Sequence, residues 1–397
     1  MLLKNDAGTL PLALRAGLRI ALIGPNANAT YGLLGSYSDP HCCTTGIPSL
    51  HDELAARAAQ AGATLAYAQG CVSVGGRSPT ACNTTAGFAE AAAAAASADV
   101  SVVVLGMGNS NFGCGRVPDS SDCEAEAHDR PTCVLPGQQA ALLAAVRAAS
   151  ARPVIGVLVH GGALCLDAPT IGAADAWLDL FYPGMRGAAA AADALVGAFS
   201  PAGRSPISWY ASDAALPADR AEMSPYANTS TGSPGLTYRF YDEAVGAPRP
   251  FTFGEGLSYT TFSASNPVAP TSVGPCDDVP VTVTVRNTGS VASDVVVTLF
   301  LAQDVSVPAP LTRLVSFSRV RNVAPGAAVD VTLPPVRPNA RSVIHDDGGD
   351  VYTIAGKRWN EVGALRFRVV LGEHGGDRAG GLAFTVAQTG AQDISTC

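Results

Sequence analysis

The sequence has few charged residues and no basic block. Only 15% of its 397 residues are Asp, Glu, Lys or Arg, and the formal net charge of −8 is spread along the chain. Binding to nucleic acid or to an anionic membrane needs a concentrated positive field, which this distribution does not supply. We therefore expect neither of these partners.

Long apolar runs are absent as well. A transmembrane helix needs about 20 mostly apolar residues, and the nearest candidate, AAAAAASADVSVVVLGMG, is interrupted by Asp99. That stretch is better explained as a helix end followed by a strand, so we expect no membrane span. The first residues also lack the apolar core of a signal peptide, because Lys4, Asn5 and Asp6 follow Met1 closely.

The short motifs of common metal and nucleotide sites are missing too. No C-x-x-C pair is present to favour zinc, and neither G-x-S-x-G nor G-x-x-x-x-G-K-[ST] occurs. We therefore expect no metal and no cofactor. A serine hydrolase or a nucleotide-dependent enzyme is the least favoured function.

Cysteine itself is abundant. Ten cysteines, an even number, fit disulfides formed in an oxidising compartment, although spacing alone leaves their pairing open. Three N-x-[ST] sequons, at Asn28, Asn83 and Asn228, agree with this and are candidate glycosylation sites. We expect a secreted protein, and because no signal peptide accompanies these features, we expect that its true beginning is missing. The cysteines are Cys42, Cys43, Cys71, Cys82, Cys114, Cys123, Cys133, Cys165, Cys276 and Cys397.

Residues from about 18 to 210 alternate continuous apolar runs with alanine-rich stretches that favour helix. Apolar runs of strand length suit parallel strands that are covered on both faces. The pattern predicts an α/β sandwich, with a mostly parallel sheet and flanking helices. The predicted strands are 18–24, 99–106, 153–160 and 176–182.

The pattern changes twice after this region. Around residues 211–276 it breaks into Pro, Gly, Ser and aromatic residues, which indicates an extended connector. From about residue 278 the apolar residues recur with a period of two, as in VPVTVTVRNTG and DVVVTLFLAQ. Short alternating strands separated by Gly, Pro and Asn turns predict a second, all-β sandwich.

One loop concentrates acidic residues. The stretch DCEAEAHDR lies between Met107 and Leu135, directly after a predicted strand, and parallel sheets bind ligands beyond the carboxyl ends of their strands. A carboxyl group donates a proton near neutral pH only if burial or neighbouring carboxylates raise its pKa. The cluster fits either a catalytic acid with its neighbours or a solvated loop, and its spacing does not decide between them. Its members are Asp122, Glu124, Glu126 and Asp129, followed by Arg130, which we expect to pair with Asp129.

The same residues resemble a known family. The segment EAEAHDRPTCVLPGQQ resembles the E-x-E-x-x-D-R-x-x-L-x-L-P-G-x-Q segment of glycoside hydrolase family 3, and the likeness is closest to its β-xylosidase and α-L-arabinofuranosidase branch. The C-terminal strands are similar to the family's fibronectin type III-like module. Further similar segments, in the family's order, are LLKNDAGTLPL, IALIGPNANATYGLLGSY, YPGMRG, PAGRSPISWY, PGLTYRFY and FTFGEGLSYTTF.

The resemblance covers nearly the whole chain and implies how it is divided. We expect a linker remnant from a preceding domain, then the family's C-terminal α/β sandwich domain, an extended connector, a fibronectin type III-like β-sandwich and a short tail. The corresponding ranges are 1–17, 18–225, 226–276, 277–389 and 390–397.

The resemblance also implies a function. Members of the family are retaining glycosidases, in which a TIM barrel supplies an aspartate nucleophile and the α/β sandwich supplies a glutamic acid as general acid/base. Glu126, three residues before Asp129-Arg130, is the candidate acid/base, and Glu124 is the reserve candidate. Asp122, Asp129 and Arg130 are expected to support the loop. The implied substrate is an oligosaccharide or an aryl or alkyl glycoside, and xyloside, arabinoside and glucoside remain open.

The barrel, which takes about 250 residues, is not present before Leu2. We therefore expect the chain to be the C-terminal part of an exo-acting glycosidase and to be inactive unless a partner supplies that domain. A catalytically inactive carbohydrate- or protein-binding module that retains the fold is the alternative.

Two positions depart from the family pattern. Met185 and Arg186 follow YPG, where the family usually has a small acidic or polar residue, and His160 stands where relatives often carry a small residue. We expect His160 to be structural. Trp209 and Tyr210 are expected to be packing residues.

Overall fold

The computed structural model describes residues 1–35, 46–73, 80–109, 123–124, 130–217, 224–345, 357–373, 375–377, 380–394 and 397. The chain forms two compact units. The first comprises Met1–Pro201, Trp209–Ala215 and Pro248–Pro250, and the second comprises Ala202–Ser208, Leu216–Ala247 and Phe251–Cys397.

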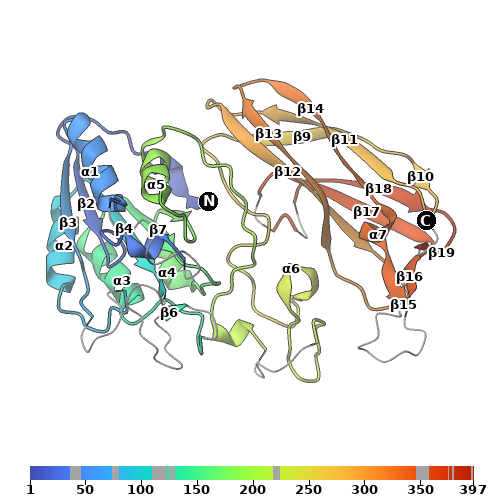
Figure 1. Ribbon diagram of the computed structural model, residues 1–397, viewed down its shortest axis with the longest axis horizontal. Helices are drawn as coiled ribbons and strands as arrows, with labels where there is room; N and C mark the ends of the chain where they lie inside the picture. Colours follow the sequence, from blue (N-terminus) through green and yellow to red (C-terminus); the bar gives the residue numbers. More distant parts are fainter. Residues whose placement is uncertain are drawn as a thin grey trace. The chain divides into compact units, whose positions relative to one another are not determined.

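The first unit is built on a six-stranded sheet with the order β1-β8-β7-β4-β2-β3 (Figure 1). The strands from β8 to β3 run parallel, and β1 pairs antiparallel with β8 at one edge. Every residue of β4 and β7 is buried, which is why these strands are continuous apolar runs in the sequence. The strands are β1 (Leu2–Asn5), β2 (Arg19–Ile23), β3 (Thr64–Ala68), β4 (Val100–Gly106), β7 (Val154–Val159) and β8 (Ala176–Asp179).

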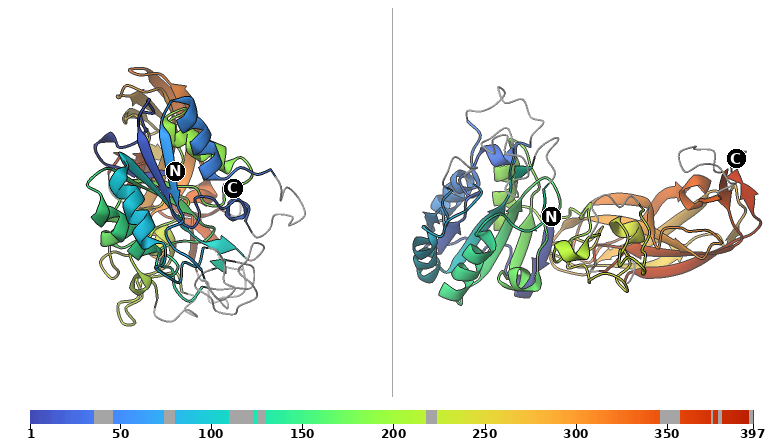
Figure 2. Two further views of the ribbon diagram at one scale, coloured as in Figure 1. Left: turned by 90° about the vertical axis from the view of Figure 1, so that its left-hand side faces the viewer. Right: turned by 90° about the horizontal axis from the view of Figure 1, so that it is seen from below.

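Helices cover both faces of this sheet (Figure 2). Helix α1 packs against α5, and α2 packs against α3, so the sheet lies between two helical layers. A capping box starts α1, because Ser49 Oγ accepts from the Asp52 amide at 3.1 Å and the Ser49 amide donates to the Asp52 carboxylate at 2.9 Å. The first unit is thus built as an α/β sandwich. The helices are α1 (Leu50–Gln60), α2 (Phe88–Ser97), α3 (Gln139–Ala149), α4 (Ala168–Gly172) and α5 (Gly187–Val196).

The second unit packs a five-stranded sheet, β10-β18-β17-β12-β13, against a three-stranded sheet, β14-β11-β9. Side chains of both sheets share one core, as Val283 of β11, Leu299 of β12 and Phe367 of β17 illustrate. Burial alternates along β11, as a period of two requires when one face of a sheet is covered. The strands are β9 (Phe262–Val268), β10 (Ser272–Val273), β11 (Val279–Asn287), β12 (Ser293–Gln303), β13 (Arg313–Val323), β14 (Ala328–Val336), β17 (Gly363–Val370) and β18 (Leu382–Gln388).

Smaller elements complete the two units. A short sheet, β15-β16-β19, belongs to the second unit, and the pair β5-β6 belongs to the first. Their bounds, with those of the remaining helices, are β5 (Gly108–Asn109), β6 (Cys123–Glu124), α6 (Thr237–Phe240), α7 (Pro338–Arg341), β15 (Val343–His345), β16 (Lys357–Asn360) and β19 (Gln392–Asp393).

Two segments differ from the boundaries expected from the sequence. Residues 2–5, expected within a linker remnant, form the edge strand β1, because Leu2 and Leu3 are buried in the first unit. Residues 262–268, expected within the connector, form β9 and pair with β11. Several residues of this edge strand are small or polar, so its sequence shows little hydrophobic periodicity.

Disulfides are found within both units. Cys71–Cys82 and Cys133–Cys165 lie in the first unit, and Cys276–Cys397 lies in the second. Cys123 is disulfide-bonded as well. In the part of the chain that the structure describes, no helix is both long and apolar enough to cross a membrane.

Candidate functional site

The acidic loop leaves the carboxyl end of β4, a central strand of the sheet. Strand β4 ends at Gly106, where a Cβ atom would lie 1.9 Å from the Val159 carbonyl oxygen of β7, so only glycine fits this close approach. Strand β7 is the parallel neighbour of β4, and β8 is the parallel neighbour of β7 on its other side. The segments that follow these three strands therefore meet at one edge of the sheet, where ligands bind in parallel α/β folds.

Glu124 connects the segments that follow the three strands. Its Oε2 accepts from the Gly161 amide at 2.5 Å and from the Tyr182 hydroxyl at 2.7 Å. Its Oε1 accepts from the Gly162 amide at 2.9 Å and lies 3.3 Å from Arg130 Nη2. The Glu124 side chain is 12% exposed. Two backbone amides, a hydroxyl and a guanidinium thus converge on this one carboxyl group.

The positions of the two glycines beside Glu124 leave no room for a larger residue. A Cβ atom at Gly161 would lie 2.4 Å from the Tyr182 ring and 3.0 Å from Glu124 Oε2, and one at Gly162 would lie 3.0 Å from Glu124 Oε1. Larger residues would push the carboxylate away from the two amides. The pair of glycines after β7 is therefore part of the binding geometry of Glu124.

Arg130 completes this arrangement. It forms its ion pair with Glu124, and its side chain is 12% exposed. Its Nη2 donates to the Ala163 carbonyl oxygen, and its Nη1 lies 3.9 Å from the Met107 sulfur. Glu124 is thus the carboxylate that the strand order brings to the Arg130 guanidinium. The pairing expected with Asp129 falls outside the described residues.

Tyr182, in the YPG motif after β8, is held in the same cluster. Burial, followed by the charge of Glu124 and the hydrogen bond to it, raises the pKa of the Tyr182 hydroxyl far above its ordinary value of 10.0. The phenol therefore stays protonated in the physiological range and acts as a hydrogen-bond donor to Glu124.

Replacing Tyr182 with Phe is expected to lower the free energy of unfolding by about 1.5 kcal/mol, because a hydrogen bond to a buried carboxylate is lost. Urea denaturation followed by circular dichroism measures this change. Tyr67→Phe is the matched control, since among the described residues the Tyr67 hydroxyl makes no hydrogen bond. The phenylalanine ring would keep the contact with His51. Equal effects of the two variants would show that the Glu124 contact contributes nothing.

His160 supports the cluster from the core. It is fully buried, its Nε2 lies 2.7 Å from Asp179 Oδ1, and its Nδ1 lies 2.7 Å from the Gly162 carbonyl oxygen. Each ring nitrogen is thus within hydrogen-bond distance of an oxygen, one from a side chain and one from the backbone. The ring packs on Phe181 and on the fully buried Trp209. These contacts fit the structural role expected for His160 and the packing role expected for Trp209.

The far end of the acidic loop is also attached. The Cys133–Cys165 disulfide joins it to the segment after β7, and the Cys165 amide donates to the Cys133 carbonyl oxygen at 2.7 Å. The Cys133 amide donates to Asp213 Oδ1 at 2.9 Å, and Thr132 Oγ1 donates to the same carboxylate. The residues on both sides of 125–129 are thus fixed to the carboxyl edge of the sheet.

Several predicted site residues lie outside the described residues: Glu126, Asp129 and Asp122. The three sequon asparagines Asn28, Asn83 and Asn228 are described and exposed. Among the described residues, no group of three His, Cys, Asp or Glu side chains is arranged to hold a metal ion.

Sequence reasoning did not identify the partners of Glu124. The signals that were available are the glycine pair in VHGGA and the tyrosine of YPG, each placed directly after a predicted strand. Because the carboxyl ends of parallel strands share an edge, these positions could have been grouped with the acidic loop.

Comparison with known proteins places this geometry in context. The model of the glycosyl hydrolase family 3 C-terminal domain matches residues 1–259. The chain is 34% identical over 356 residues to the probable exo-1,4-β-xylosidase bxlB of Aspergillus flavus, which is 84% of this chain and 40% of that protein. It is 36% identical over 281 residues to β-D-xylosidase 1 of Arabidopsis thaliana, covering 69% of this chain and 32% of that protein.

Solved structures with the same fold are similar over nearly the whole chain. A GH3 exo-β-xylosidase, XlnD, solved with a xylobiose aziridine activity-based probe, has a TM-score of 0.78 and 26% identity, covering 99% of this chain and 47% of that one. A GH3 β-glucosidase of Bifidobacterium adolescentis has a TM-score of 0.73 and 27% identity, covering 98% of this chain and 51% of that one. The chain thus spans 40% or less of these two curated relatives and about half of the solved chains.

Proposed function

Because the chain belongs to glycosyl hydrolase family 3, we propose that it is the C-terminal part of a retaining, exo-acting, β-xylosidase-like glycosidase. It contributes the general acid/base from the loop after β4. A TIM barrel domain contributes the aspartate nucleophile and most contacts to the sugar. The substrate is an oligosaccharide or an aryl or alkyl glycoside of the kind found in xylan, arabinoxylan or β-glucan breakdown.

The Glu124 cluster is the observation that supports this proposal. Glu124 accepts from Gly161, Gly162 and Tyr182 and pairs with Arg130, so it serves as an anionic tether. Glu126 lies between the two attached residues Glu124 and Arg130 in the sequence. We assign the acid/base role to Glu126, since Glu124 is already engaged by donors on both oxygens.

The assigned roles follow the chemistry of retaining hydrolysis. Two carboxyl groups about 5–5.5 Å apart flank the scissile bond. The barrel's aspartate attacks the anomeric carbon while Glu126 protonates the leaving oxygen. Glu126 then removes a proton from the water that cleaves the glycosyl-enzyme. Such proton transfer requires the acid to lie within reach of the leaving oxygen.

Three further features are part of the proposal. The second unit, with two sheets over one core, is a fibronectin type III-like module. The disulfides and the exposed sequons at Asn28, Asn83 and Asn228 support secretion and N-glycosylation of the mature protein. Cofactors and metals take no part in the reaction described above.

The test joins this chain to the barrel of a family 3 xylosidase. We expect the joined protein to hydrolyse 4-nitrophenyl β-D-xyloside with retention of anomeric configuration, measured by proton NMR of the first product. The chain without a barrel is the control and is expected to show no turnover. If the joined protein folds and binds xylosides without turnover, the inactive binding module is the correct function.

A further inference from the structure

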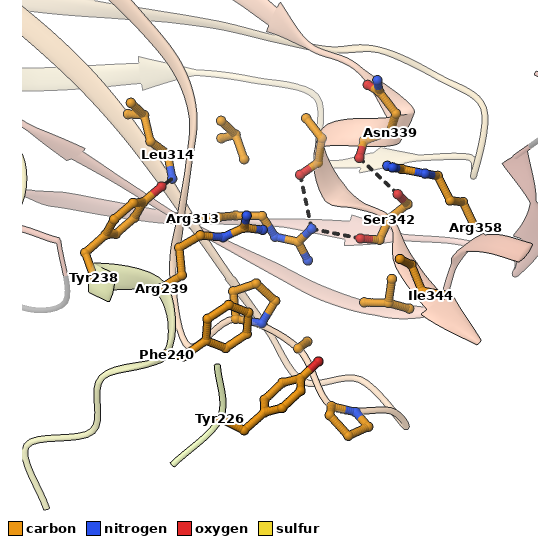
Figure 3. Close-up of a pocket in the computed structure, with 16 residues that line it drawn as sticks. Tyr226, Tyr238, Arg239, Phe240, Arg313, Leu314, Asn339, Ser342, Ile344 and Arg358 are labelled. Carbon is orange, nitrogen blue, oxygen red and sulfur yellow. Dashed lines mark hydrogen bonds between the residues drawn. The ribbon is translucent and has the colours of Figure 1, made fainter. Parts of the chain in front are cut away.

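The second unit contains a cavity of about 490 Å³ (Figure 3), whereas the Glu124 cluster belongs to the first unit. It is lined by α6, by the residues before and at the start of β13, and by α7, β15 and β16. All of its lining residues belong to the second unit. The proposed hydrolysis makes no use of it.

The cavity is strongly basic. Arg239, Arg313 and Arg358 line it, and among the described residues no carboxylate forms an ion pair with any of them. Arg313 is 8% exposed, and burial, followed by the neighbouring Arg239, lowers its pKa to about 10. Arg313 therefore remains charged at neutral pH. A buried guanidinium without an acidic partner is costly, and a bound anion would remove that cost.

The guanidinium of Arg313 is held in a fixed orientation. Its Nη1 donates to the carbonyl oxygens of Ala340 and Ser342 at 3.3 and 2.8 Å (Figure 3). Its Nη2 donates to Gln303 Oε1 at 2.6 Å. Arg239 lies 5.7 Å from the centre of the Phe240 ring. Arg313 is thus positioned before any ligand binds, which lowers the entropic cost of binding, whereas the Arg239 side chain is exposed.

Aromatic rings form another part of the cavity lining. Tyr226 and Phe240 lie 5.0 Å apart in an edge-to-face arrangement, and Tyr226 is 41% exposed. The ring of Tyr238 stacks on Phe253, and its hydroxyl accepts from the Leu314 amide, so it shapes the lining. An exposed aromatic face beside fixed cations suits a ligand that has both an apolar ring face and a negative charge.

We propose that this cavity binds an acidic saccharide, a pyranose that carries a carboxylate, with the carboxylate on Arg239, Arg313 and Arg358 and the ring against Tyr226 and Phe240. The identity of the ligand as a saccharide rests on the proposed function. The cavity would bind the acidic side groups of a polysaccharide and so strengthen the binding of the enzyme to acidic polysaccharides.

The test measures binding directly by isothermal titration calorimetry with the full chain. The probe is a xylo-oligosaccharide that carries one glucuronic acid, and its methyl ester, unsubstituted xylotriose and inorganic phosphate are the comparisons. We expect the acid to bind at least about tenfold more tightly than the ester, because the ester cannot form charge-assisted hydrogen bonds. Binding of the acid should weaken with salt.

Variants identify the cavity. Arg239→Met and Arg358→Met are each expected to weaken binding of the acid by about tenfold. Both side chains lack structural hydrogen bonds among the described residues, so folding should be retained, whereas Arg313 has structural contacts and is left unchanged. Arg286→Met is the control, since this exposed arginine of β11 does not line the cavity.

Three results would overturn the proposal: equal binding of the acid and its ester, equal binding of phosphate and the acidic saccharide, or unchanged binding in Arg239→Met. Because binding is measured without turnover, failure here is distinct from failure of the proposed function. Hydrolysis by the barrel-joined protein with no binding of the acid removes only the cavity proposal. Binding of the acid without any hydrolysis removes only the glycosidase proposal.

Discussion

Replacing Glu126 with Gln in the barrel-joined protein is expected to lower the rate of xyloside hydrolysis by about 10²–10⁴-fold, the usual contribution of general acid/base catalysis. Gln keeps the size of the side chain and removes the transferable proton. The loss should be largest for substrates with poor leaving groups, because these depend most on protonation of the departing oxygen. Initial rates with alkyl and 2,4-dinitrophenyl β-D-xylosides measure this difference.

A chemical rescue separates an acid/base role from a general disturbance of the site. Azide attacks the glycosyl-enzyme without base assistance, so it should restore turnover of the activated xyloside in Glu126→Gln and yield the β-xylosyl azide. A variant damaged in its folding would not respond. If Glu126→Gln keeps full activity, or loses activity that azide does not restore, Glu126 is not the acid/base.

Replacing Glu124 with Ala is expected to have its main effect on stability. The free energy of unfolding should fall by about 3 kcal/mol, since removing one partner of a buried ion pair leaves the other charge uncompensated. Arg130, the amides of Gly161 and Gly162 and the Tyr182 hydroxyl would all lose the acceptor that Glu124 provides. Urea denaturation measures the change, and hydrogen exchange at the two glycine amides should accelerate.

Two further variants complete this experiment. Glu90→Ala removes an exposed glutamate of α2 and is expected to change stability by less than about 0.5 kcal/mol. Glu124→Gln keeps the shape but weakens the contacts, so its effect should fall between those of Glu124→Ala and the parent. Should Glu124→Gln instead leave stability intact and show azide-rescued loss of activity, Glu124 rather than Glu126 would be the acid/base.

Glu124 and Glu126 illustrate how much of the candidate site could be predicted from the sequence. The sequence placed both in one loop beyond a buried strand, because hydrophobic runs mark strands locally. It could not separate them. The distinction depends on Gly161, Gly162 and Tyr182, which are 37, 38 and 58 residues away from Glu124 along the chain.

The sequence by itself determined the two-part organisation of the chain. Continuous apolar runs predicted β2, β4, β7 and β8, because strands buried on both faces are apolar at every position. A period of two predicted strands such as β11, because only one face of such a strand is buried. The edge strands β1 and β9 were less evident, because an edge strand is short or carries few apolar residues. The likeness to the family likewise rested on short local motifs.

The tertiary structure alone decided which polar groups meet. The order β8-β7-β4 brings the segments after three strands to one edge, and this makes Glu124 a partner of Arg130. Similarly, the basic cavity joins Arg239 of α6 to Arg313 of β13 and Arg358 of β16. The positions of charged residues in the sequence show no periodicity that identifies their partners. Those partners are determined only by the backbone arrangement, which the packing of apolar residues fixes.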